Sequence, residues 1–75
     1  MDDTADMARY EALAEEAWSA MYEAAPYSVK DYYDDARLYL NKAIALASGA
    51  DLERLTARSQ HFVAVYNSQF RYVRR

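Results

Sequence analysis

The chain has 75 residues, no cysteine, one histidine and a formal net charge of −3. This composition excludes disulfide bonds and the usual zinc sites, which need several Cys or His ligands. With one Gly and one Pro in the chain, few positions interrupt a helix. We expect a single all-α domain over residues 1–75, a small three-helix bundle with antiparallel helices at about 4–25, 28–48 and 51–72.

The first predicted helix has an apolar face and an acidic face. Asp3 or Thr4 is a suitable N-cap. Pro26 ends the helix, because the residue before a proline is disfavoured in the α conformation. The apolar positions recur with helical spacing, and they are Tyr10, Leu13, Ala14, Ala17, Trp18, Met21 and Ala25.

The second predicted helix is apolar over more than half of its circumference, so it should contact both other helices. Ser28 is the expected N-cap, with Asp31 as its capping-box partner. Gly49 is expected to end the helix in a left-handed conformation. The core stripe is Val29, Tyr32, Ala36, Leu40, Ala43 and Ala47, widened by Tyr33, Tyr39, Ile44 and Leu46.

Residues 33–46, YDDARLYLNKAIAL, resemble the second helix of a tetratricopeptide repeat, in which an Ala, an aromatic residue and a Lys-Ala pair recur at this spacing. The preceding helix departs from that pattern. Trp18 matches the leading Trp of the repeat, but Met21 and Tyr22 stand where a Leu-Gly pair is expected, and the loop is longer. We interpret the similarity as helix packing of the same kind.

The third predicted helix is capped by Asp51, with Ser48 as the alternative. Its core stripe is Leu52, Leu55, Ser59, Phe62, Val63, Tyr66, Phe70 and Val73. Charge is divided unevenly along the chain. Residues 1–35 hold ten acids and two bases, a formal charge of −8, whereas residues 36–75 hold seven bases and two acids, a charge of +5.

No residue pattern indicates catalysis, a cofactor or a metal. Neighbouring carboxylates such as Asp34 and Asp35 point about 100° apart on a helix, so they do not converge on one substrate atom. Ser59 and His61 face different ways on their helix for the same reason. The single glycine rules out a Gly-rich phosphate loop. We therefore expect a protein that is not an enzyme.

The acidic first half of the chain, which also carries several tyrosines, is the surface we expect to bind another protein. Carboxylates spaced along helices present a charge pattern like that of a phosphate backbone, so the partner could itself bind nucleic acid. In general style such a chain resembles phage- or plasmid-borne inhibitors, and a regulator or adaptor is equally compatible. The residues of this predicted face are Glu11, Glu15, Glu16, Glu23, Asp31, Asp34, Asp35, Tyr22, Tyr27 and Tyr32.

The alternative working surface is basic and lies on the third helix, where it would contact nucleic acid. Its residues are Arg54, Arg58, His61, Arg71, Tyr72 and Arg75. We do not expect nucleic acid as the main partner, because the net charge is negative, and these arginines could instead balance the acids of the first two helices. The many aromatic residues favour a homodimer. No apolar run reaches the ~20 residues of a membrane span, and the N-terminus is acidic, so we expect a cytoplasmic protein.

Overall fold

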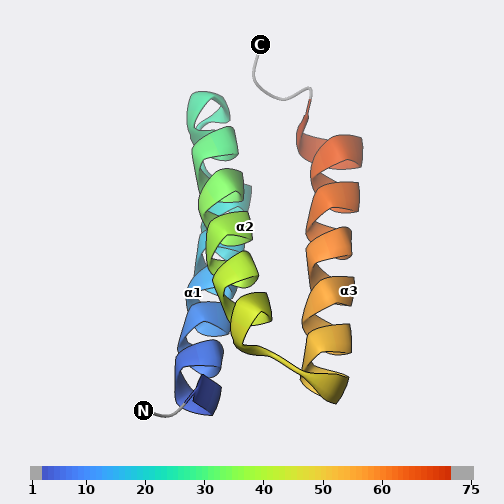
Figure 1. The fold of residues 1–75 in the computed structure, drawn as a ribbon. Helices are drawn as coiled ribbons and strands as arrows, with labels where there is room; N and C mark the ends of the chain where they lie inside the picture. Colours follow the sequence, from blue (N-terminus) through green and yellow to red (C-terminus); the bar gives the residue numbers. More distant parts are fainter. Residues whose placement is uncertain (1–2, 72–75) are drawn as a thin grey trace.

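The computed structural model describes residues 3–71 and confirms an all-α three-helix bundle. The α-helices are α1 (Asp3–Glu23), α2 (Val29–Leu46) and α3 (Gly49–Val65). A short 3-10 helix, η1 (Pro26–Ser28), joins α1 to α2, and a π-helical turn, η2 (Tyr66–Phe70), extends α3. Consecutive helices run antiparallel, with α1 and α2 side by side and α3 next to that pair (Figure 1).

The connection between α1 and α2 follows from Pro26. Ala25 is extended, with φ −61° and ψ 149°, as expected for the residue before a proline. The backbone N–H of Ser28 then donates to the carbonyl of Ala25 at 2.8 Å, closing the 3-10 turn. Ser28 occupies the N-cap position of α2, but its side chain makes no cap hydrogen bond. The expected capping box is absent because Ser28 is itself helical, at φ −103° and ψ −8°.

The connection between α2 and α3 differs from the prediction in two details, the role of Gly49 and the N-cap of α3. The structure places Gly49 in the left-handed region, at φ +58°, but as the first residue of α3 and not as the terminator of α2. The extended residues Ala47 and Ser48 break α2 instead. Ser48 is the N-cap of α3, so Asp51 lies in the first turn, where its carboxylate faces the positive end of the helix dipole.

The end of the third helix also differs from the prediction. We expected an α-helix to residue 72, but the α geometry stops at Val65 and gives way to a π turn, closed by a hydrogen bond from the N–H of Arg71 to the carbonyl of Tyr66 at 2.8 Å. Each π turn holds an extra residue, so it changes the direction of the following side chains. Here Phe70 meets Tyr22 of α1 edge-on, with ring centroids 4.8 Å apart. Val73 and Tyr72 lie outside the described residues.

The core forms one cluster shared by all three helices. Two residues that the sequence predicted in the core, Tyr32 and Leu52, lie outside this cluster. Tyr32 is 38% exposed, whereas its neighbour Tyr33 is 7% exposed and stacks on Tyr66 with ring centroids 3.8 Å apart. Leu52, expected in the core, is also exposed. The buried residues are Met7, Ala14, Trp18, Met21, Val29, Tyr33, Ala36, Leu40, Ala43, Leu55, Phe62 and Tyr66.

Within residues 3–71, no helix is both long enough and apolar enough to cross a membrane.

Candidate functional site between α1 and α2

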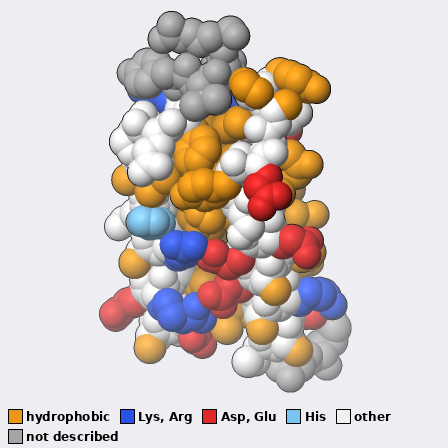
Figure 2. Space-filling model, turned by 180° about the vertical axis from the view of Figure 1, so that it is seen from behind, with side chains coloured by type: hydrophobic (Ala, Val, Ile, Leu, Met, Phe, Trp, Pro, Cys, Tyr) orange, Lys and Arg blue, Asp and Glu red, His pale blue; other side chains and the backbone are white. Residues whose placement is uncertain are grey.

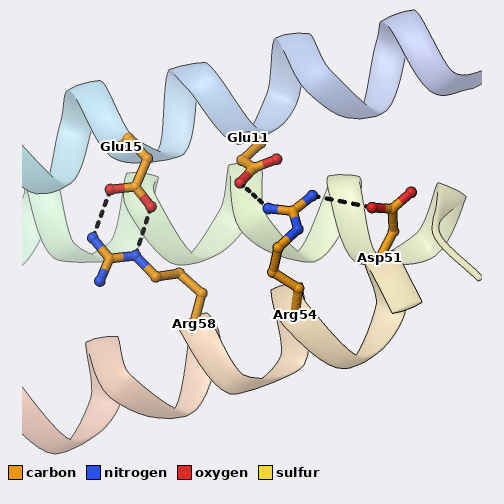
Figure 3. A network of polar contacts seen from close by, with 5 residues as sticks. All are labelled: Glu11, Glu15, Asp51, Arg54 and Arg58. Carbon is orange, nitrogen blue, oxygen red and sulfur yellow. Dashed lines mark hydrogen bonds and ion pairs between the residues drawn. The ribbon is translucent and has the colours of Figure 1, made fainter. Parts of the chain in front are cut away.

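The acids of α1 are divided between two sides of the helix. On the side facing α3, Glu15 accepts two hydrogen bonds from Arg58, both at 2.7 Å. Arg54 donates one hydrogen bond to Glu11 and another to Asp51, the latter at 3.3 Å (Figure 3). The negative first half and the positive second half of the chain therefore meet across α1 and α3. Glu11 and Glu15, two members of the predicted acidic face, are thus neutralised by arginines of the same chain.

These contacts also affect the arginines. The hydrogen bond to Glu11 raises the pKa of Arg54, with the hydrogen bond to Asp51 as the next cause. The hydrogen bond to Glu15 raises the pKa of Arg58 and outweighs the opposing effect of burial. A raised folded-state pKa stabilises the fold at any pH below the unfolded value, and this contribution disappears only as the pH rises through the folded value. Arginine titration therefore has no effect on stability near neutral pH.

A hollow of about 220 Å³ lies on the α1–α2 pair. The lining residues span positions 13–20 of α1 and 32–39 of α2. Within each set, residues three, four or seven positions apart lie on the same side of the helix. The deeper part is formed by half-buried side chains, and three exposed side chains, Glu16, Tyr32 and Asp35, stand around it. None of the lining residues comes from α3. The full set is Leu13, Glu16, Ala17, Ala20, Tyr32, Asp35 and Tyr39.

The two carboxylates at the hollow differ from those facing α3. Among residues 3–71, neither Glu16 nor Asp35 forms an ion pair. The two tyrosines of the hollow are similar in this respect. Within the same described range, cations lie over the rings of Tyr10, Tyr33 and Phe62, but over neither tyrosine of the hollow. The hollow thus combines two carboxylates, two tyrosine rings and an apolar floor, and among residues 3–71 no Lys or Arg lines it.

The other residues of the predicted acidic face lie apart from the hollow. Asp34 pairs with Lys30 at 2.9 Å on the outer surface of α2. Tyr22 contacts Trp18 of α1 and Phe70 of η2 edge-on. The remaining members are exposed near the connection between α1 and α2, at the end of α1, in η1 and in the first turn of α2, and they are Glu23, Tyr27 and Asp31.

Of the predicted face, the structure therefore brings together Glu16, Asp35 and Tyr32. Sequence reasoning missed Tyr39, which was assigned to the edge of the core. The sequence held no signal for it, because the hollow forms where Ala17 and Ala20 of α1 lie near Tyr32 and Tyr39 of α2. That arrangement depends on how the two helices pack.

The predicted basic face also has fewer available residues than the sequence suggested. Arg54 and Arg58 are held by the carboxylates described above. His61 is exposed and lies 6.5 Å from the Trp18 ring, measured between centroids. Arg71 is exposed after η2. Tyr72 and Arg75 lie outside the described residues.

Within the described range 3–71, no three His, Cys, Asp or Glu side chains gather closely enough to hold a metal ion.

Comparison with known proteins gives no relative: no family model, no curated protein and no solved structure matches the chain.

Proposed function

We propose that this chain is a non-catalytic binding protein that recognises a basic surface of another protein through the hollow between α1 and α2. The observation that carries the proposal is the contrast between adjacent residues of α1. Glu15 is paired with Arg58, whereas Glu16 and Asp35 line a hollow and find no cation among residues 3–71. Unpaired carboxylates at a concave surface attract a positively charged partner and raise the rate of association.

Within this proposal the chain acts as a regulator, an adaptor or an inhibitor in the cytoplasm. An inhibitor that covers the basic groove of a nucleic-acid-binding protein is one form of it, because such a groove supplies the cations that Glu16 and Asp35 lack. The size of the hollow supports a binding role over a catalytic one. The hollow of about 220 Å³ is smaller than the ~300–1,000 Å³ of typical small-molecule sites.

The alternative, nucleic-acid contact through the basic face of α3, has less support. Binding to a phosphate backbone requires guanidinium groups that are free to neutralise phosphates and displace the counterions held by the nucleic acid. Arg54 and Arg58 already donate to Glu11, Asp51 and Glu15. A phosphate would have to compete with these carboxylates while approaching the acidic α1.

A capture experiment with two matched variants tests the proposed function. The protein is immobilised and exposed to a cell extract, together with the Glu16→Gln/Asp35→Asn variant and the Glu11→Gln/Glu15→Gln variant. Both variants lose two negative charges, so a difference between them cannot come from net charge. We expect proteins that are retained by the original chain and by the Glu11/Glu15 variant but are released by the Glu16/Asp35 variant. Equal retention by all three would contradict the proposal.

Self-association through a different surface is a second proposal. Tyr22 is 53% exposed although it contacts two other rings. Figure 2 shows apolar side chains gathered in the upper part of the face where α1 and α3 meet, above the region of Arg and acidic side chains. Exposed apolar patches of this kind often mark contacts between proteins. Light scattering over a concentration series should give a mass above the 8.7 kDa of one chain, reduced to that mass by Tyr22→Lys. A constant monomer mass would rule out the homodimer.

A further inference from the structure

We propose that the hollow between α1 and α2 is a socket for one arginine side chain of the partner protein, with the guanidinium held by Glu16 and Asp35. This inference rests on the proposed function and specifies what the partner inserts. It follows from the size of the hollow, the chemistry of its lining and a contact that the protein already makes elsewhere.

The size of the hollow favours a single side chain. A volume of about 220 Å³ is below the ~300–1,000 Å³ range of sites for cofactors and other small molecules. The hollow is also partly open, since Glu16, Tyr32 and Asp35 are exposed while they line it. A side chain projecting from a partner surface enters such a hollow from outside and needs no closing lid.

The lining matches an amphipathic cation. Leu13, Ala17 and Ala20 provide an apolar floor, against which the methylene stem of an arginine or lysine packs. The tyrosine rings favour arginine over lysine. A guanidinium is planar and weakly hydrated, stacks on aromatic faces and forms paired hydrogen bonds to carboxylates, whereas an ammonium is a compact and strongly hydrated charge. Two tyrosines and two carboxylates together therefore favour arginine.

The protein already holds one guanidinium in this way. Arg58 makes two 2.7 Å hydrogen bonds to Glu15 and lies 4.9 Å from the centroid of the Phe62 ring. Glu15 and Glu16 are neighbours on α1, so their side chains point about 100° apart, one toward α3 and one toward the hollow. On the first side the carboxylate, the aromatic ring and the guanidinium are all present. On the second side the carboxylates and the rings are present, and the described residues supply no cation.

Three short peptides test the socket directly. Acetylated and amidated Ala-Ala-Arg-Ala-Ala is titrated into the isotopically labelled protein at low salt, and binding is followed by NMR chemical shifts. The counterparts carry lysine, or citrulline, which keeps the shape of arginine but has no charge. We expect shifts at the residues lining the hollow, with the arginine peptide several-fold tighter than the lysine peptide and the citrulline peptide weaker by about tenfold or more. Equal binding of arginine and citrulline, or shifts centred on Glu11 and Glu15, would overturn the socket.

Two variants separate charge from shape. Glu16→Gln/Asp35→Asn should weaken the arginine peptide by about tenfold or more, while Glu11→Gln/Glu15→Gln leaves it unchanged. Ala20→Leu fills the hollow without altering its charge and should also abolish binding. Its control, Ala12→Leu, places the same side chain on an exposed part of α1 outside the hollow and should have no effect. Full binding by Ala20→Leu would show that the peptide does not enter the hollow.

A free small guanidine is distinguished with propylguanidine, which carries the same singly charged head group and methylene stem without a peptide backbone. Propylguanidine should bind more weakly than the arginine peptide, because it lacks the partner backbone around the socket. If propylguanidine binds more tightly, the occupant is a small guanidine and the assignment to a protein partner is overturned. If the peptide fails while protein capture still depends on Glu16 and Asp35, the socket is wrong and the proposed function stands.

Discussion

The α1–α2 pair and the α1–α3 pair are joined by different chemistry. Most of the close backbone approaches in the bundle are between α1 and α2, where Ala14, Ala36 and Ala43 are completely buried. The backbones of α1 and α3 scarcely approach one another. Their gap is filled by large rings, with Trp18 stacked on Phe62 at 4.1 Å between centroids, and by the arginine–carboxylate pairs. Small side chains bring two helices together, whereas large ones keep them apart and leave room for charges at the rim.

This difference determines what holds α3 in place. Each aromatic side chain buries roughly 150–250 Å² and gains further from ring stacking. An exposed ion pair contributes only about 0–1 kcal/mol, because water and salt screen it. Arg58 and Glu15 have side-chain exposures of 36% and 38%. We therefore expect the rings to supply most of the attachment of α3, and the arginines to fix its register along α1.

Removing the central ring should have the largest effect. Phe62→Ala deletes a completely buried side chain that stacks on Trp18, and the expected loss in unfolding free energy is about 3–5 kcal/mol. The measurement is denaturant unfolding followed by the fluorescence of Trp18, the only tryptophan of the chain. The control, Ala64→Gly, alters an exposed residue of the same helix and should cost about 1 kcal/mol or less through helix propensity. Equal losses in the two variants would show that the Trp18–Phe62 stack does not hold α3.

Sequence periodicity predicted the α1–α2 pair better than the position of α3. Alanines with helical spacing identified the buried stripe of α2, and Pro26 identified the end of α1. The choice between Tyr32 and Tyr33 could not be made from periodicity, because both lie near the edge of the apolar stripe. It depends on Tyr66, which is far away in the sequence and stacks on Tyr33. The π turn after Val65 escaped prediction for a similar reason, since its local sequence is compatible with an ordinary α-helix.

Overpacking the alanine contact should have the second largest effect. Ala43 is completely buried where α2 meets its neighbours, so Ala43→Leu adds volume where no space exists and should cost about 1–3 kcal/mol. The measurement is the thermal unfolding midpoint, which should fall clearly below that of the original chain. Ala45→Leu adds the same side chain at an exposed position of α2 and should leave the midpoint nearly unchanged. Coinciding melts for the two leucine variants would show that the packing of Ala43 is not tight.

The candidate site was only partly predictable from the sequence. Acidic residues and tyrosines in the first half of the chain indicated a binding surface, and Glu16, Asp35 and Tyr32 belong to the hollow. What the sequence did not provide was the rotation of each helix. That rotation turns Glu11 and Glu15 toward Arg54 and Arg58, while the next residue, Glu16, faces away from α3. A difference of one residue decides whether a carboxylate is neutralised inside the chain or available to a partner.

The smallest expected effect is that of the ion pair between Arg58 and Glu15, and it sharpens the comparison between the two helix pairs. A double-mutant cycle with Arg58→Gln and Glu15→Gln isolates their coupling from the loss of each side chain alone. Because both groups are more than one third exposed, we expect a coupling of about 0.2–1 kcal/mol, falling as salt is raised from low to physiological concentration. Lys30 and Asp34, which pair at 2.9 Å on the outer surface of α2, provide a reference cycle with an expected coupling of about 0.3–0.5 kcal/mol. The Arg58 cycle differs in one respect, because its two hydrogen bonds connect separate helices and Arg58 also lies over the Phe62 ring. If the coupling free energy of Arg58 and Glu15 exceeded the loss of unfolding free energy in Phe62→Ala, the ion pairs and not the rings would hold α3 against α1.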